Sequence, residues 1–176
     1  MSLHIFYGII SFIGGIKADI LDYRDEIIKL ALDQLDKPYV RDTYGPDSFD
    51  CAGFLSYVFG EVFDINLFEE GIGGSTTGKI MTCKWGKIER YQENYDILFK
   101  LSKIEPGDIL LFHSQSPEAT IPKEDNRYPG HCGIYLGDEE FIHCAFNRQK
   151  VCVDTFEIKR YQKILVASRR IEKEDV

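Results

Sequence analysis

Apolar residues recur at helical spacing in the first third of the chain. Between Asp19 and Asp36 they lie three or four positions apart, and Pro38 follows, so the pattern predicts one amphipathic helix. A polar, turn-rich stretch with the sequence RDTYGPDS, residues 41–48, separates it from a second helical pattern. The apolar face of this second helix carries Phe54, Leu55, Val58, Phe59 and Val62.

The next segment, Asn66 to Lys100, has no clear period. Four glycines interrupt it, and the aromatic residues that follow them suit a helix or a strand equally well. We expect this segment to be mostly loop, with a short helix near Tyr91 to Phe99.

After residue 106 the pattern changes to short runs of β-forming residues. Five of them, each bounded by Gly, Asp or Asn, begin at Ile109, His131, Glu140, Lys150 and Lys163. Helices followed by such strands predict an α+β fold, in which an antiparallel sheet of about five or six strands packs against the N-terminal helices. Between the first two runs lies a long connection, Ser114 to Gly130, of the kind that is usually a functional lid or disordered.

The chain is long enough for one domain. With 176 residues and 44% hydrophobic content, we expect a single domain over residues 19–176, preceded by an apolar arm at residues 1–18. The arm has no positively charged start and no A-x-A site, which favours a packed segment over a signal peptide. The sequence leaves the compartment unknown: the protein is cytoplasmic, or it is exported to the cell wall if a signal peptide has been removed.

Charge and cysteine content exclude several classes of protein. The net charge of −8 lacks the basic footprint of nucleic-acid binding, so no nucleic-acid partner is expected. No run of 18 apolar residues exists, so no membrane span is expected. Five cysteines at irregular spacing argue against a disulfide framework and favour a reducing compartment.

Cys51 falls in the first turn of the second predicted helix. Helix N-termini favour negative charge, and together with a nearby His⁺ they lower a cysteine pKa to roughly 3.5–7.5. A second interpretation is also open: Phe54, Leu55 and Val58 share a helix face with Cys51, which would make it a buried core residue.

Two histidines flank a predicted hairpin, HCGIYLGDEEFIHCA. If Gly137 to Glu139 form a three-residue loop, His143 faces Gly133, and His131 is its diagonal neighbour on the same face, at about 7–8 Å between backbones. A two-residue loop would instead place the histidines on opposite faces. The three-residue loop thus supplies a base and an orienting group for Cys51, with His113 a less suitable alternative base at a strand end.

A zinc site is the competing interpretation of these residues. The same register places Cys132 opposite Cys144, on the other face of the sheet from His131 and His143. Because one metal ion cannot readily collect ligands from both faces of a sheet, we expect no metal.

Three blocks in order resemble the NlpC family of papain-like cysteine peptidases, which cut peptide stems of bacterial cell walls. They are PYV…FDCAGF, PGDILLFH and HCGIYLGDEEFIHCAF, and the resemblance runs from about Tyr39 to Val153. It implies a papain-like fold with the nucleophile at a helix N-terminus and no cofactor.

The resemblance also implies roles for individual residues. Cys51 would be the nucleophile, His131 the general base and then acid, and His143 the residue orienting His131. Tyr39 would line the site near the oxyanion, although a hydrogen-bonded core tyrosine is equally compatible with the sequence. Asp50 would help bind the free amine of the peptide stem, although aspartate is also a favoured N-cap.

Two departures from the family pattern concern the substrate. Ala52 stands where the family usually has Ser, which removes a hydroxyl from the substrate wall, and RDTYG at residues 41–45 replaces a common Trp-Gly-Gly. The implied partner is a peptidoglycan stem peptide or muropeptide, cut between γ-D-glutamate and a diamino acid. An amidase or acyltransferase of the same fold, or a non-catalytic member, remains as the alternative.

Overall fold

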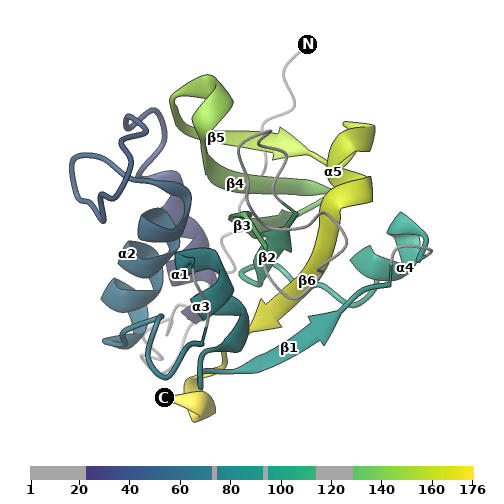
Figure 1. The fold of residues 1–176 in the computed structure, drawn as a ribbon, viewed down its shortest axis with the longest axis horizontal. Helices are drawn as coiled ribbons and strands as arrows, with labels where there is room; N and C mark the ends of the chain where they lie inside the picture. Colours follow the sequence, from purple (N-terminus) through teal and green to yellow (C-terminus); the bar gives the residue numbers. More distant parts are fainter. Residues whose placement is uncertain (1–22, 73–74, 93–94, 114–128) are drawn as a thin grey trace, which may run out of the picture.

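The computed structural model describes residues 23–72, 75–92, 95–113 and 129–176, which build one sheet with helices on both of its sides (Figure 1). The elements follow one another as α1 (Tyr23–Leu32), α2 (Cys51–Phe63), α3 (Thr76–Thr82), β1 (Lys87–Arg90), α4 (Ile97–Leu101), β2 (Ile109–Phe112), β3 (His131–Gly137), β4 (Glu140–Ala145), η1 (Phe146–Arg148), β5 (Lys150–Thr155), α5 (Lys159–Ile164), β6 (Leu165–Arg170) and η2 (Lys173–Asp175).

The sheet has six strands in the order β1-β6-β2-β3-β4-β5, and every neighbouring pair is antiparallel. The predicted α+β class and antiparallel sheet are therefore confirmed, with α2 beginning at Cys51. Helix α1 ends earlier than predicted, at Leu32, because residues 33–36 turn and Asp36 takes a left-handed backbone with φ 66°.

The segment predicted as loop contains more structure than its pattern indicated. It holds α3 and β1, while the expected helix near Tyr91 to Phe99 lies slightly later, as α4. The loop prediction was wrong for α3 because burial of Ile80 and Met81, rather than helix propensity, stabilises this short element. It was wrong for β1 because an exposed four-residue edge strand carries no alternation of apolar residues.

Two apolar cores occupy the two faces of the sheet, as pleating requires. In β2, Ile109 and Leu111 join the core beneath α1, α2 and α3, whereas Leu110 and Phe112 join the core beneath α4 and α5. Figure 1 shows these two groups of helices on opposite sides of the strands. His131 and His143 share the face of Leu110 and Phe112, because Cys132 and Cys144 lie in the first core.

The hairpin between β3 and β4 has the predicted register beyond its turn, but the turn itself differs from the prediction. The turn is the two residues Asp138 and Glu139, and Gly137 pairs with Glu140, so the prediction of a three-residue loop was wrong. A bulge between Tyr135 and Gly137 then adds one residue to β3. Beyond this bulge Ile134 faces Ile142, as the three-residue loop would have required, and the two histidines remain on one face.

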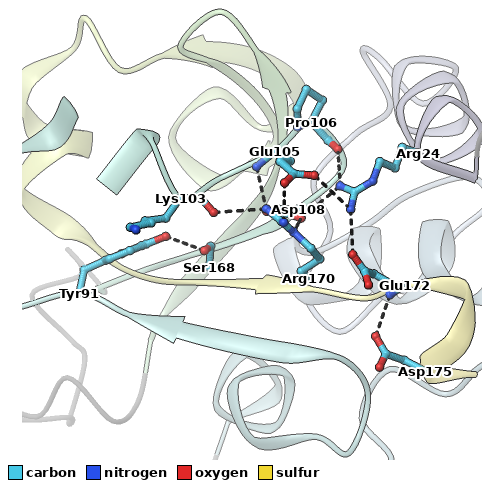
Figure 2. A network of polar contacts seen from close by, with 10 residues as sticks. All are labelled: Arg24, Tyr91, Lys103, Glu105, Pro106, Asp108, Ser168, Arg170, Glu172 and Asp175. Atoms are coloured by element: carbon cyan, nitrogen blue, oxygen red, sulfur yellow. Dashed lines mark hydrogen bonds and ion pairs between the residues drawn. The ribbon is translucent and has the colours of Figure 1, made fainter. Parts of the chain in front are cut away.

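A buried ion pair fixes the start of β2. Asp108 is 2% exposed and accepts hydrogen bonds from Arg170 Nε at 3.0 Å and Nη2 at 2.8 Å. Arg24 of α1 lies 3.5 Å from the same carboxylate, and Arg170 also bonds Glu105 (Figure 2). This network joins α1, β2 and β6, and β2 in turn places Phe112 opposite His131.

Two predictions concern segments that lie wholly or mostly outside the described residues. The apolar arm at residues 1–18, and with it the proposed division at residue 19, lies outside the described residues, as do residues 114–128 of the predicted lid. Within the ranges that the structure describes, every helix is too short or too polar to cross a bilayer.

Candidate active site

Cys51 is the first residue of α2, and Asp50 is its N-cap. The Asp50 carboxylate accepts a hydrogen bond from Gly53 N at 2.7 Å and another from Asp42 N at 3.1 Å. Asp50 is 8% exposed, and burial raises its pKa. Both oxygens are thus engaged by backbone N–H groups, as the N-cap interpretation requires, and binding of a substrate amine by Asp50 stays a prediction.

Gly53 allows the preceding loop to lie directly on the first turn of α2. A Cβ atom at Gly53 would stand 2.0 Å from the carbonyl oxygen of Thr43. The same carbonyl accepts a hydrogen bond from Asp50 N at 3.0 Å. The sequence AGF after Cys51 therefore positions the loop that borders the cysteine.

The surroundings of Cys51 stabilise a thiolate. Its pKa is lowered well below the ordinary value by a hydrogen bond from the Cys132 thiol, against the opposing effect of burial, and by a hydrogen bond and positive charge from His131. The Ala52 N–H contributes in the same direction. Cys51 as a residue is only partly buried, in contrast to the other four cysteines, which are buried.

His131 and His143 meet as the register predicted. His131 Nε2 lies 2.7 Å from His143 Nδ1, with the rings nearly edge to face at 70°. Gly133 makes room for this contact, since a Cβ atom there would lie 3.2 Å from Cβ of His143 and 2.9 Å from Ile142 O. Because His131 hydrogen-bonds Cys51, the structure brings all three predicted catalytic residues into one chain of contacts.

The chain of contacts continues to Asp154, which the sequence analysis missed. His143 Nε2 lies 3.2 Å from Asp154 Oδ2, and Tyr161 and Arg148 also donate hydrogen bonds to this carboxylate. The signal was available: on the strand pair β4 and β5, His143 faces Cys152, so Asp154 is the diagonal neighbour of His143 on the same face.

Tyr39 and Ala52 occupy different environments. Tyr39 is partly exposed and packs against Phe146, with ring centroids 5.4 Å apart. Burial, followed by the nearby Cys51 and Asp50, raises the pKa of Tyr39 to about 12, so its hydroxyl is a donor at neutral pH. Ala52 is 0% exposed and packs into the core, so its methyl group does not face solvent and the predicted substrate contact gains no support.

The cysteines and histidines of the competing zinc interpretation lie on opposite faces of the sheet. All five are free thiols. Cys132 and Cys144 lie on the face opposite the histidines, where they donate to the carbonyl oxygens of Cys51 and Phe49, each at 3.2 Å.

Another group places three candidate ligand atoms within 4.8 Å of one another: His143, Cys152 and Asp154. The Asp154 carboxylate already accepts hydrogen bonds from Arg148, Tyr161 and His143. The positive charge of the Arg148 guanidinium also disfavours binding of a cation here. We interpret this group as a hydrogen-bond network.

Comparisons with known proteins identify the family of the chain. The chain matches the model of the NlpC/P60 family over residues 36–170. A curated relative named "Probable endopeptidase p60", from Listeria grayi, is 29% identical over 137 residues, which are 78% of this chain and 20% of that protein. "Probable endopeptidase YafL", from Escherichia coli strain K12, is 25% identical over 143 residues, or 81% of this chain and 47% of the relative.

Solved structures show the same fold. NlpC2 from Trichomonas vaginalis superimposes with a TM-score of 0.61 at 24% identity, covering 88% of this chain and 49% of that one. The NlpC/p60 domain of the peptidoglycan hydrolase SagA gives a TM-score of 0.56 at 24% identity, covering 84% of this chain and 98% of that one. This chain spans less than half the length of the two curated relatives. With the family model matched over residues 36–170, the chain belongs to the NlpC/P60 family.

Proposed function

We propose that this protein is a cysteine endopeptidase that hydrolyses amide bonds in peptidoglycan stem peptides. The observation that carries the proposal is the placement of Cys51 at the start of α2 beside His131, which His143 contacts from the other side at 2.7 Å. Curated relatives named as endopeptidases, and the likeness to a domain of a peptidoglycan hydrolase, support the substrate class.

Acylation begins with attack of the Cys51 thiolate on the amide carbonyl carbon. A C–S bond forms, and the carbonyl oxygen becomes an oxyanion. Backbone N–H groups at the start of α2, together with the protonated hydroxyl of Tyr39, stabilise this charge. His131 then gives its proton to the leaving nitrogen, the C–N bond breaks and the amine departs.

Deacylation returns the enzyme to its starting state. His131, now neutral, removes a proton from water, which attacks the thioester carbonyl. The C–S bond breaks, the carboxylate product leaves and the Cys51 thiolate is restored beside protonated His131. The bond we propose for cleavage joins γ-D-glutamate to the diamino acid of the stem.

Muropeptide digestion tests this proposal. Purified wild type, Cys51→Ala and the control Cys83→Ala are incubated with defined muropeptides, and the products are identified by mass spectrometry. Cys83 is a suitable control because it is also a free cysteine, and burial raises the pKa of its thiol instead of lowering it. We expect cleavage at the γ-D-glutamyl bond by wild type and Cys83→Ala only. Zero turnover by all three would refute the proposal.

A second candidate, an amidase or acyltransferase acting on another amide or ester, is favoured by exposed apolar residues in the same part of the chain as Tyr39. Val40, Tyr44 and Phe146 are 44%, 45% and 64% exposed. Exposed apolar residues beside a site suit a substrate with an apolar group. Acyl esters and glutamine-containing peptides, offered beside muropeptides, distinguish the two candidates, because turnover of these compounds alone would select the second.

A further inference from the structure

We propose that Asp154 is a positioning residue that acts through His143 to fix which ring nitrogen of His131 carries its proton. The inference rests on the proposed function, in which His131 transfers the proton. It adds a fourth member to the predicted trio and assigns a direction to each hydrogen bond between Asp154 and Cys51.

The first step is that Asp154 accepts hydrogen bonds and donates none. Its side chain is 2% exposed and accepts hydrogen bonds from Tyr161, Arg148 and His143. Burial alone would raise the pKa of Asp154, but the hydrogen bonds from His143 and Tyr161 outweigh it and hold the pKa below the ordinary value. An ionised carboxylate has no proton to give, so His143 Nε2 must be the donor in their contact.

The second step concerns the other nitrogen of His143. Its side chain is 1% exposed, and burial lowers its pKa to about 4 despite the hydrogen bond to Asp154. A neutral imidazole carries one proton, and because this proton is on Nε2, Nδ1 is an acceptor. His131 Nε2, 2.7 Å away, must therefore donate to it.

The third step leads to the nucleophile. With Nε2 of His131 directed at His143, Nδ1 remains for the hydrogen bond with Cys51. His143 stays an acceptor when His131 is the imidazolium, so His131 keeps the same ring orientation in both protonation states.

Two variants separate this role from simple packing. In Asp154→Asn the amide oxygen should face the Arg148 guanidinium, because that group has only hydrogen-bond donors. The amide NH₂ group then faces His143 Nε2, which must accept a hydrogen bond from it. His143 then carries its proton on Nδ1 and can no longer accept from His131. Cys152→Ala is the matched control, since the Cys152 sulfur also touches His143 Nε2, at 3.6 Å, and its removal leaves the Asp154 carboxylate that the proposal makes responsible for the tautomer.

The direct readout is the tautomer of His143, measured in ¹⁵N-histidine NMR spectra at pH 7. We expect the Nε2–H form in wild type and Cys152→Ala and the Nδ1–H form in Asp154→Asn. An Nδ1–H form in wild type would overturn the proposal, even if Asp154→Asn failed to fold. Because this measurement needs no substrate, it is independent of whether muropeptides are cleaved.

Kinetics supply the second readout. With the substrate that wild type turns over, Asp154→Asn is expected to lower kcat by at least about a hundredfold with little change in KM, as for a misoriented histidine in a triad. Cys152→Ala, which leaves the carboxylate in place, should lose much less kcat than Asp154→Asn. Equal losses of kcat in both variants would mean that packing around His143, rather than the carboxylate, is responsible, and would overturn the proposal.

Discussion

Cys132 Sγ lies 3.2 Å from the backbone oxygen of Cys51, and the Cys132 thiol is also close enough to the Cys51 sulfur to lower the pKa of Cys51. The two cysteines differ in their preferred charge. The pKa of Cys51 is lowered, with Cys132 as the largest cause, while burial and the Cys51 contact raise the pKa of Cys132 well above its ordinary value. Cys132 thus remains a protonated donor beside the nucleophile.

The first prediction follows from this pair. Cys132→Ala removes the donor, so the pKa of Cys51 should rise and alkylation of Cys51 should require higher pH. Cys132→Ser keeps a hydroxyl donor at the same place and should shift the profile less. The rate of iodoacetamide labelling against pH measures both variants. Identical profiles for Cys132→Ala and wild type would show that His131 and the helix start suffice.

The second prediction concerns the stability of the protein in mild acid. Burial lowers the pKa of His143 to about 4, so between pH 6.5 and 4 the unfolded chain binds a proton that the folded chain does not. The free energy of unfolding should therefore fall as the pH falls, by up to about 1.4 kcal/mol per pH unit. Urea unfolding of wild type at pH 7 and pH 5 should differ by about 2 kcal/mol more than that of His143→Asn. An equal difference in both proteins would contradict the buried neutral imidazole.

The third prediction tests whether the absence of a side chain at Gly133 allows His143 to pack closely against β3. Gly133→Ala puts a Cβ atom 2.9 Å from Ile142 O and 3.2 Å from Cβ of His143, which should displace the histidine. We expect a loss of about 1–3 kcal/mol in stability and roughly tenfold or more in kcat.

The matched control for Gly133→Ala is Gly60→Ala in α2. A Cβ atom at Gly60 would meet only Ile65 O, at an ordinary 3.5 Å. This substitution should stabilise the helix by about 0.5–1 kcal/mol and leave kcat unchanged. Unimpaired kcat in Gly133→Ala would show that the two histidines do not need this close approach.

The fourth prediction concerns the ion pair in Figure 2. Asp108→Asn leaves Arg170 and Arg24 without the charge of their buried partner, and should cost about 2–4 kcal/mol of stability in urea unfolding. Asp33→Asn is the control, since its pair with Lys29 is on the surface and should contribute less than about 0.5 kcal/mol. A loss below 1 kcal/mol in Asp108→Asn, on the order of a surface pair, would contradict a structural role for this network.

The sequence predicted the elements whose signal is local. The helix at Cys51 and the strands after residue 106 have clear periods. Alternation along β3 and β4 placed His131 beside His143 only with an assumed three-residue loop, and the structure reaches the same register through a two-residue turn and a bulge. The turn was assigned incorrectly because a two-residue turn with a bulge and a three-residue loop give the same register beyond them. The two kinds of turn differ only in the backbone of residues 135–140.

Elements stabilised by distant parts of the chain could not be predicted in this way. Strand β1 exists because it pairs with β6, where Lys87 faces Arg170 some eighty residues later. Asp154 differs from β1, because extending the alternation argument by one strand, to β5, would have found it.

The most direct test of the central claim is the pH dependence of Cys51 alkylation in wild type and His131→Asn, with the labelled cysteine identified by mass spectrometry. If His131 stabilises a Cys51 thiolate, wild type should be labelled at Cys51 well below the pH that a free thiol requires, about 8.5, and His131→Asn should need higher pH. Labelling of wild-type Cys51 only above about pH 8, unchanged in His131→Asn, would contradict the ion pair and with it the proposed peptidase mechanism.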